Sequence, residues 1–236
     1  MPYPLSHRAE TRKRIVDSAR RLFNRHGFEN VSIAQVMAGA DLTHGGFYSY
    51  FKAKSELYTE VLDCFFTDPE WKNNWDGVSV DMASSDVGAQ VVNAYLSRQH
   101  FESVENSCPM IALPSDVART SVAARKAFEK VFEAMVSLLE RSIPNDGPGR
   151  RNTAHAIAAL SIGGMVVSRA LVNRAHADAL RESCLKAALK LGGWNMPSNV
   201  KELPPKRRSK RSRSTQSAFL PWQIPSIEGP ELAVTS

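Results

Sequence analysis

Two consecutive glycines stand inside a stretch that otherwise has the pattern of short helices, residues 32–58, SIAQVMAGADLTHGGFYSYFKAKSELY. The pattern predicts a helix over residues 33–39, then a tight connection, then a second helix opened by Thr43, whose hydroxyl can accept an N-cap hydrogen bond. Inside that second helix Gly45 and Gly46 each cost about 1 kcal/mol relative to alanine. Two such costs in a row indicate a functional surface, because a helix without side chains can approach the major groove of DNA closely.

The residues after the glycines fit this interpretation. Phe47 and Phe51 are four positions apart and share one helical face, which predicts that they lie in the core. Tyr48 lies on a different face, where its hydroxyl can bind a phosphate. Lys54 stands at the start of the next predicted helix, residues 55–66, where an ammonium group and backbone amides together favour phosphate binding. The order of elements is that of a helix-turn-helix, whose second helix presents its N-terminal residues to base edges.

The stretch resembles the DNA-binding domain of the TetR/AcrR family of bacterial transcriptional regulators. The resemblance runs from Thr11 to Leu62, and its motifs are Gly27-Phe28, Ser32, Tyr48-Ser49-Tyr50-Phe51 and Lys54-Ser55-Glu56-Leu57. Two positions depart from the family pattern. Asp41 stands where a turn glycine is usual, and aspartate tolerates the left-handed backbone that such a turn needs. Met37 stands where alanine is usual, which alters the packing between the two helices.

The resemblance implies sequence-specific binding to double-stranded DNA. The helix from Thr43 onward, including Gly45, is expected to enter the groove, with Thr43, His44 and Gly46 at base edges. Phosphates are expected to contact Ser32, Tyr48 and Lys54.

Charge distribution agrees with a nucleic-acid partner. The formal net charge is +6, and residues 1–54 carry nine Lys and Arg against four Asp and Glu. Residues 201–213 carry seven more Lys and Arg against one Glu. A basic N-terminal module on a near-neutral body favours DNA binding.

The sequence also predicts a cytoplasmic protein without a membrane segment. Cys64, Cys108 and Cys184 are odd in number and widely spaced, which suits a reducing compartment. The N-terminus lacks an apolar signal core, and the longest uncharged apolar run, about residues 156–167, is too short to span a bilayer. The histidines and cysteines lack metal-ligand spacing, and no catalytic or phosphate-cradling motif is visible. We therefore expect no cofactor, no metal and no enzyme activity.

Apolar residues recur with helical spacing and no strand pattern competes, which predicts an all-α fold. We expect a helix-turn-helix DNA-binding domain over residues 1–62, a helical-bundle effector-binding and dimerisation domain over residues 63–197, and a basic, disordered tail over residues 198–236. Further helices are predicted over about residues 8–26 and 87–103, and a short one is predicted after Pro109. Three longer ones follow, from Thr120 to 141, from 152 or 153 to 174, and around 180–191.

The second domain resembles one subgroup of the same family through CPMIALPSDVART, residues 108–120. The family resemblance implies a small-molecule effector, and the aromatic content favours a hydrophobic one. The candidate effector-binding residues are Trp71, Tyr95, Phe101, Met110, Phe132 and Met135, and Trp75 and Phe128 belong to the same group of aromatic and sulfur residues. Each of these is a core residue in the alternative interpretation. Cys108 is either a redox-sensing thiol or a small apolar residue, and the second is the more common case.

The helix of small residues predicted after residue 152 is a candidate dimer interface. Ala154, Ala158, Ser161 and Met165 share one side, and the Gly163-Gly164 pair permits close approach. The alternative is a central helix buried within one subunit. The family resemblance favours a homodimer, and two-fold symmetry then predicts a roughly palindromic operator.

Together these observations predict a homodimeric transcriptional repressor that a small hydrophobic effector releases from its operator. One alternative is a nonspecific, nucleoid-type DNA-binding protein that uses its basic tail, with equal affinity for any DNA and a steep salt dependence. A small-molecule enzyme is the other alternative, and it would retain no particular DNA sequence.

Overall fold

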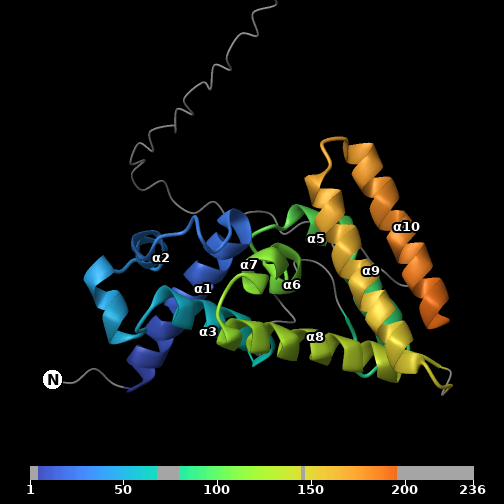
Figure 1. The fold of residues 1–236 in the computed structure, drawn as a ribbon, viewed down its shortest axis with the longest axis horizontal. Coiled ribbons are helices and arrows are strands. Elements are labelled where there is room, and N and C mark those ends of the chain that lie inside the picture. Colours follow the sequence, from blue (N-terminus) through green and yellow to red (C-terminus); the bar gives the residue numbers. More distant parts are fainter. Residues whose placement is uncertain (1–4, 68–79, 145–146, 196–236) are drawn as a thin grey trace, which may run out of the picture. The chain divides into compact units, whose positions relative to one another are not determined.

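The computed structural model describes residues 5–67, 80–144 and 147–195. Over these ranges the regular structure consists of helices, without a strand, which confirms the predicted all-α class (Figure 1). Trp71, Trp75 and the predicted tail lie outside the described residues.

The N-terminal part contains α1 (Leu5–His26), α2 (Ile33–Gly39), the short 3₁₀-helix η1 (His44–Ser49) and α3 (Lys54–Thr67). α1 ends where the sequence predicts, because Gly27 adopts a left-handed φ of 78° that other residues disfavour. The side chains of Phe23, Phe47 and Phe51 are fully buried in this part. Burying a side chain of this size stabilises the fold by roughly 1.5–3 kcal/mol.

The remaining helices are α4 (Val87–Tyr95), α5 (Arg98–Glu102), α6 (Pro109–Ala112), α7 (Pro114–Ala118), α8 (Val122–Ser142), α9 (Arg150–Ala170) and α10 (Arg174–Gly192). α8 packs against α3 at one end and against α9 at the other. α9 and α10 form an antiparallel pair joined by a short connection (Figure 1).

Three predicted helix boundaries are wrong because a local side-chain cap stands elsewhere, and α9 begins at Arg150 rather than at Asn152 or Thr153. The single helix expected over residues 87–103 is broken after Tyr95, and the Ser97 hydroxyl accepts from the His100 amide (3.1 Å) to begin α5. Ser121 rather than Thr120 caps α8, through a hydrogen bond from the Ala124 amide (3.2 Å).

The third difference concerns α9, which is expected to continue to residue 174 but ends at Ala170. Asn173 then caps a separate helix, α10, by accepting from the His176 amide at 3.0 Å. Asparagine and serine at such positions offer the backbone a polar partner in an extended conformation, which stops one helix and starts the next.

Two clusters of buried hydrophobic residues hold the helices together. The first belongs to α1, α2, η1 and α3. It also includes Leu113 between α6 and α7, Val117 of α7, and Ala124 and Ala127 of α8. The second is formed by α4–α6 and α8–α10. Phe128 is half-buried and packs against both clusters. The predicted boundary after Leu62 lies inside α3, and the division into two domains stays a prediction.

Candidate nucleic-acid interface

The turn between α2 and η1 is built by local side chains. Ser32 and Gln35 form a capping box at the start of α2: the Gln35 amide donates to the Ser32 hydroxyl (3.2 Å), and the Ser32 amide donates to Gln35 Oε1 (2.8 Å). After α2 the chain reverses at Asp41, whose φ is 57°. The left-handed conformation expected of this aspartate is therefore confirmed.

The second element of the motif is shorter than the α-helix expected. η1 is a 3₁₀-helix, and Thr43 precedes it without making a side-chain cap. Two glycines weaken helix formation at this point, and the tighter 3₁₀ turn is common in short segments. The predicted Thr43 cap is thus wrong, and its exposed hydroxyl makes no cap bond.

Four of the residues predicted to contact DNA are exposed at this element: Thr43, His44, Gly45 and Tyr48. Tyr48 is the most prominent, with 61% of its surface exposed. The His44 and Tyr48 rings lie edge to face with their centroids 6.2 Å apart. On the opposite side of η1, Phe47 and Phe51 are buried and stacked, as the sequence predicts, which anchors the element to the core.

The two glycines have different environments. A Cβ at Gly45 would meet no atom within 4 Å, so this glycine leaves the surface bare. A Cβ at Gly46 would contact the buried Met37 side chain at 3.6 Å. Gly46, which the sequence predicts to meet a base edge, therefore lies partly against α2. Gly45 is the glycine whose Cβ position faces open space.

Lys54 has a structural role that the sequence does not reveal. Its ammonium group donates to the carbonyl oxygens of Phe28 (2.7 Å) and Val31 (2.9 Å) and lies 4.2 Å from the centroid of the Phe28 ring. A phosphate would compete with these carbonyls, so in this conformation Lys54 stabilises the turn between α1 and α2. The Ser32 hydroxyl is likewise engaged in the capping box.

Three arginines of α1, which the sequence does not distinguish from other basic residues, bind the ends of α2 and η1. Arg8 donates to the carbonyl oxygen of Ser49 (2.6 Å), Arg12 donates to that of Tyr50, and Arg14 donates to that of Ala40. Their acceptors lie at the C-terminal ends of η1 and α2, where helical carbonyls lack internal partners. The sequence offers only a count of basic residues here, which is the usual signal for phosphate binding.

Known proteins share this motif and this fold. Residues 15–61 match the sequence model of the bacterial regulatory proteins, tetR family. The HTH-type transcriptional regulator AcrR of Shigella flexneri is 40% identical over 54 residues, which make up 23% of this chain and 25% of that protein. The chain is thus similar to TetR/AcrR-family regulators over its N-terminal helices, and the match spans about a quarter of the curated relative's length.

Solved structures extend the likeness in fold to most of the chain. The reduced form of NemR from Escherichia coli has a TM-score of 0.60 with 16% identity, covering 77% of this chain and 97% of that one. A TetR-family transcriptional regulator from Cytophaga hutchinsonii has a TM-score of 0.62 with 20% identity, covering 83% of this chain and 100% of the other.

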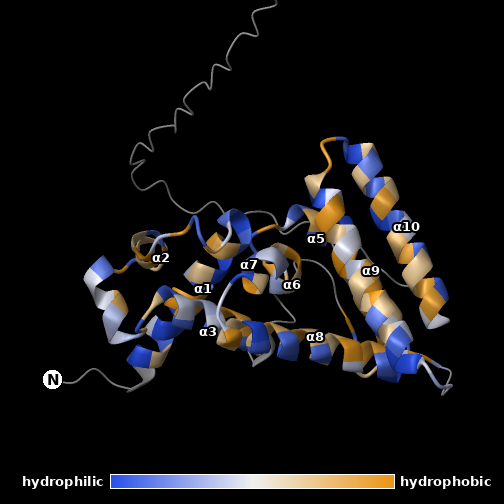
Figure 2. Ribbon diagram, in the orientation of Figure 1, coloured by the Kyte–Doolittle hydropathy of each residue, from blue (hydrophilic) through white to orange (hydrophobic). Residues whose placement is uncertain are grey.

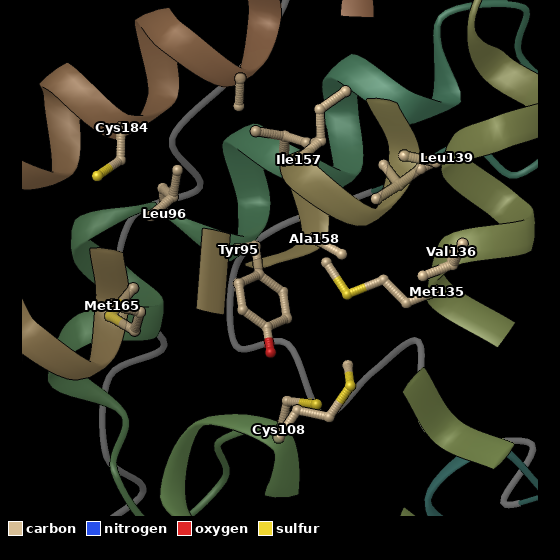
Figure 3. Close-up of a cluster of buried hydrophobic side chains, with 14 of the residues drawn as sticks. Tyr95, Leu96, Cys108, Met135, Val136, Leu139, Ile157, Ala158, Met165 and Cys184 are labelled. Atoms are coloured by element: carbon tan, nitrogen blue, oxygen red, sulfur yellow. The ribbon is translucent and has the colours of Figure 1, made fainter. Parts of the chain in front are cut away.

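Except for Trp71, which lies outside the described residues, the residues predicted to bind an effector come together in the second hydrophobic cluster. Tyr95, Phe101, Met110 and Met135 are buried there, and the half-buried Phe132 packs against them. Figure 3 shows the Tyr95 hydroxyl directed toward Cys108. Individually these side chains are core residues, as the alternative interpretation has it.

The residues predicted to form the dimer interface are inside the subunit instead. Ala154, Ala158, Ser161 and Met165 are fully buried. Small residues occur on every side of α9, so the sequence pattern could not distinguish its buried face from its exposed one. The alternative of a helix buried by its own chain is correct for this face.

A surface hollow of about 390 Å³ lies between α3 and the start of α8. The residues that line it include the acidic Glu56, Glu60 and Asp63 and none of the predicted effector residues. Among residues 5–67, 80–144 and 147–195 no group of His, Cys, Asp or Glu is arranged to hold a metal ion. None of the helices in these ranges is long and apolar enough to cross a membrane.

Burial controls the chemistry of the cysteines. It raises the pKa of the Cys108 thiol to about 12, so this group is a neutral thiol at neutral pH. Burial also raises the pKa of Cys184 and lowers that of His100 to about 4, which keeps the imidazole beside Tyr95 neutral.

We therefore predict that iodoacetamide at pH 8 alkylates Cys64, which is half-buried, before the buried Cys108 and Cys184. The thiolate is the reactive species, and the pH lies about 4 units below the pKa of Cys108. Mass spectrometry of peptides from native and urea-unfolded protein measures the order. Labelling of native Cys108 at the rate of the unfolded protein would contradict the buried placement.

Proposed function

We propose that the chain is a homodimeric transcriptional repressor that binds a roughly palindromic operator through η1. The observation that carries the proposal is the bare backbone at Gly45, flanked by exposed Thr43, His44 and Tyr48, on an element anchored from behind by Phe47 and Phe51. Such a surface can approach base edges closely while its polar side chains donate and accept hydrogen bonds. The similarity of residues 15–61 to the tetR family of bacterial regulatory proteins supports the same proposal.

The direct test uses a DNA duplex that the full-length protein selects from a random-sequence pool. Gly45→Leu should weaken binding to this duplex by about 100-fold, or ~2.7 kcal/mol, because a leucine side chain would stand between the backbone and the groove. Folding should be preserved, since the position is open and leucine favours helix more than glycine does. Fluorescence anisotropy measures the affinity, and thermal unfolding checks the fold.

Gly147 provides the matched control. Its Cβ position is also open, and it lies in the loop before α9. Gly147→Leu should bind the selected duplex as the wild type does. Wild-type affinity in Gly45→Leu would mean that η1 does not enter the groove. Failure of the wild type to enrich any sequence would favour the nonspecific, nucleoid-type alternative, whose basic tail lies outside the described residues.

The proposed dimer uses the side of α9 opposite to the one predicted. Exposed or half-buried residues repeat along it at spacings of four and three: Asn152, Ala156, Ala159, Gly163, Val166 and Ala170. Residues of hydrophobic or intermediate hydropathy cover most of α9, and hydrophilic residues lie near its ends (Figure 2). Val166 and the adjacent Val167 are 38% and 50% exposed, so a second copy packed on this side of α9 would bury their apolar surface.

Gly163 gives a test of this surface, because a Cβ there would meet no atom of its own subunit within 4 Å. Gly163→Leu should shift the protein from dimer to monomer at micromolar concentration, since the side chain would separate the two helices. Sedimentation velocity measures the shift. Gly163→Ala is the control and should remain dimeric. An undisturbed dimer in the leucine variant would place the interface elsewhere.

A hydrophobic effector is proposed to act from the second cluster on the DNA-binding helices. A chain of hydrogen bonds connects them: the Arg169 guanidinium on α9 donates to the Ser107 hydroxyl (2.6 Å), and Asn24 Nδ2 on α1 donates to the carbonyl oxygen of Ser107 (2.8 Å). Asn24 Nδ2 also donates to the Glu105 carbonyl oxygen at 3.1 Å. A ligand that moves α9 or residues 100–107 would thereby move α1.

We expect a thermal-shift screen of small hydrophobic compounds on the full chain to find stabilising ligands that weaken operator binding at least tenfold, about 1.4 kcal/mol of differential affinity. Asn24→Ala should still be stabilised by the same ligand but should release the operator less. Anisotropy titrations with and without ligand measure both effects. Stabilising ligands that leave DNA affinity unchanged would mean that the second cluster has no regulatory role.

A further inference from the structure

We infer that the Arg12–Glu60 ion pair is a positioning pair, which sets the orientation of η1 for specific DNA recognition without itself contacting DNA. The inference rests on the function proposed above.

Arg12 joins three elements at one point. From α1, its Nε donates to Glu60 Oε1 on α3 at 2.9 Å, and a terminal nitrogen donates to Oε2 of the same carboxylate. Its other terminal nitrogen donates to the carbonyl oxygen of Tyr50, the residue that follows η1. The guanidinium also lies over the Phe51 ring, 4.0 Å from its centroid. All these contacts use the planar, forked geometry of arginine, which lysine cannot reproduce.

η1 needs such support from outside. It has six residues, including two glycines, and 3₁₀ hydrogen bonds have poor geometry. Phe47 and Phe51 fix one side of it but leave its C-terminal carbonyls without helical partners. Arg12 donates to the carbonyl oxygen of Tyr50, and Arg8 donates to that of Ser49, the residue directly after Tyr48. The Arg8 guanidinium also lies 5.3 Å from the centroid of the Tyr50 ring.

Removing the charge of Glu60 distinguishes a residue that positions η1 from one that affects DNA binding through its charge alone. Glu60 is a half-buried acid on the side of α3 that meets Arg12, with 24% of its side chain exposed. If electrostatics alone governed DNA binding, removing this negative charge would strengthen binding to any DNA. If the pair positions η1, the same change weakens binding to the operator and leaves nonspecific binding unchanged or slightly stronger. The two hypotheses therefore predict opposite signs.

The experiment compares Glu60→Gln with Asp63→Asn in the full-length protein. Asp63 lies one turn further along α3 and pairs with Lys130 of α8 (3.5 Å), so the control removes the same charge away from η1. The DNA probes are the duplex selected by the wild type and a shuffled duplex of the same composition. Glu60→Gln should bind the selected duplex at least tenfold more weakly, with unchanged affinity for the shuffled duplex, whereas Asp63→Asn should behave as the wild type does.

Arg12→Lys is the second variant, because it keeps the charge and loses the fork. It should also lose specific binding at least tenfold, with the salt dependence on the shuffled duplex unchanged. Loss of a direct phosphate contact would instead reduce that slope by about 0.9. Wild-type affinity of either variant for the selected duplex overturns the inference.

Circular dichroism of each variant distinguishes a positioning pair from a stability element. Loss of the folded signal in both variants would assign the pair to stability and overturn the inference; if one variant unfolds, the other decides. A wild type that selects no sequence would refute the proposed function itself, which is a different outcome from wild-type binding by the variants.

Discussion

The backbone from Thr43 to Ser49 cannot hold its own orientation, and much of the N-terminal structure follows from that constraint. A short 3₁₀-helix with two glycines has few internal hydrogen bonds, yet one of them, Gly45, leaves the bare surface on which the proposed function depends. Rigidity is supplied from neighbouring elements: two buried phenylalanines behind, and arginines of α1 at the carbonyl end. Recognition surfaces need this support, because an element that moves by an ångström loses its hydrogen-bond geometry.

The same constraint explains where the basic residues go. Arg8, Arg12 and Arg14 bind backbone carbonyls at the ends of η1 and α2, and Lys54 binds carbonyls in the turn between α1 and α2. Arg12 is further neutralised by Glu60. A carbonyl at the end of a short helix and a DNA phosphate are both acceptors for a guanidinium or ammonium group. A count of positive charges therefore indicates the kind of partner but does not identify the residues that touch it.

The DNA-binding helices and the rest of the described chain share their packing. Leu113 and Val117 complete the N-terminal hydrophobic cluster, and Phe128 contacts both clusters. Polar contacts reinforce the junction: Asp116 on α7 accepts from the Phe28 amide at 2.8 Å, and Arg25 pairs with Glu105 at 2.6 Å. A change in the second cluster can thus reach α1 and the turn after it, which is the physical requirement for the regulation proposed here.

The sequence by itself determined the all-α class, the extent of α2, the left-handed turn at Asp41, and the burial of Phe47 and Phe51, because each follows from local spacing and backbone preference. Only the tertiary structure decided which side of α9 is exposed, since alanine, glycine and serine occur on all sides of that helix and leave its apolar and polar faces poorly distinguished. Tertiary structure also decided that Lys54 and the α1 arginines bind carbonyls and that Gly46 faces Met37. Long, flexible cations and bare glycines take their role from what lies beside them in space, and local sequence patterns do not contain that information.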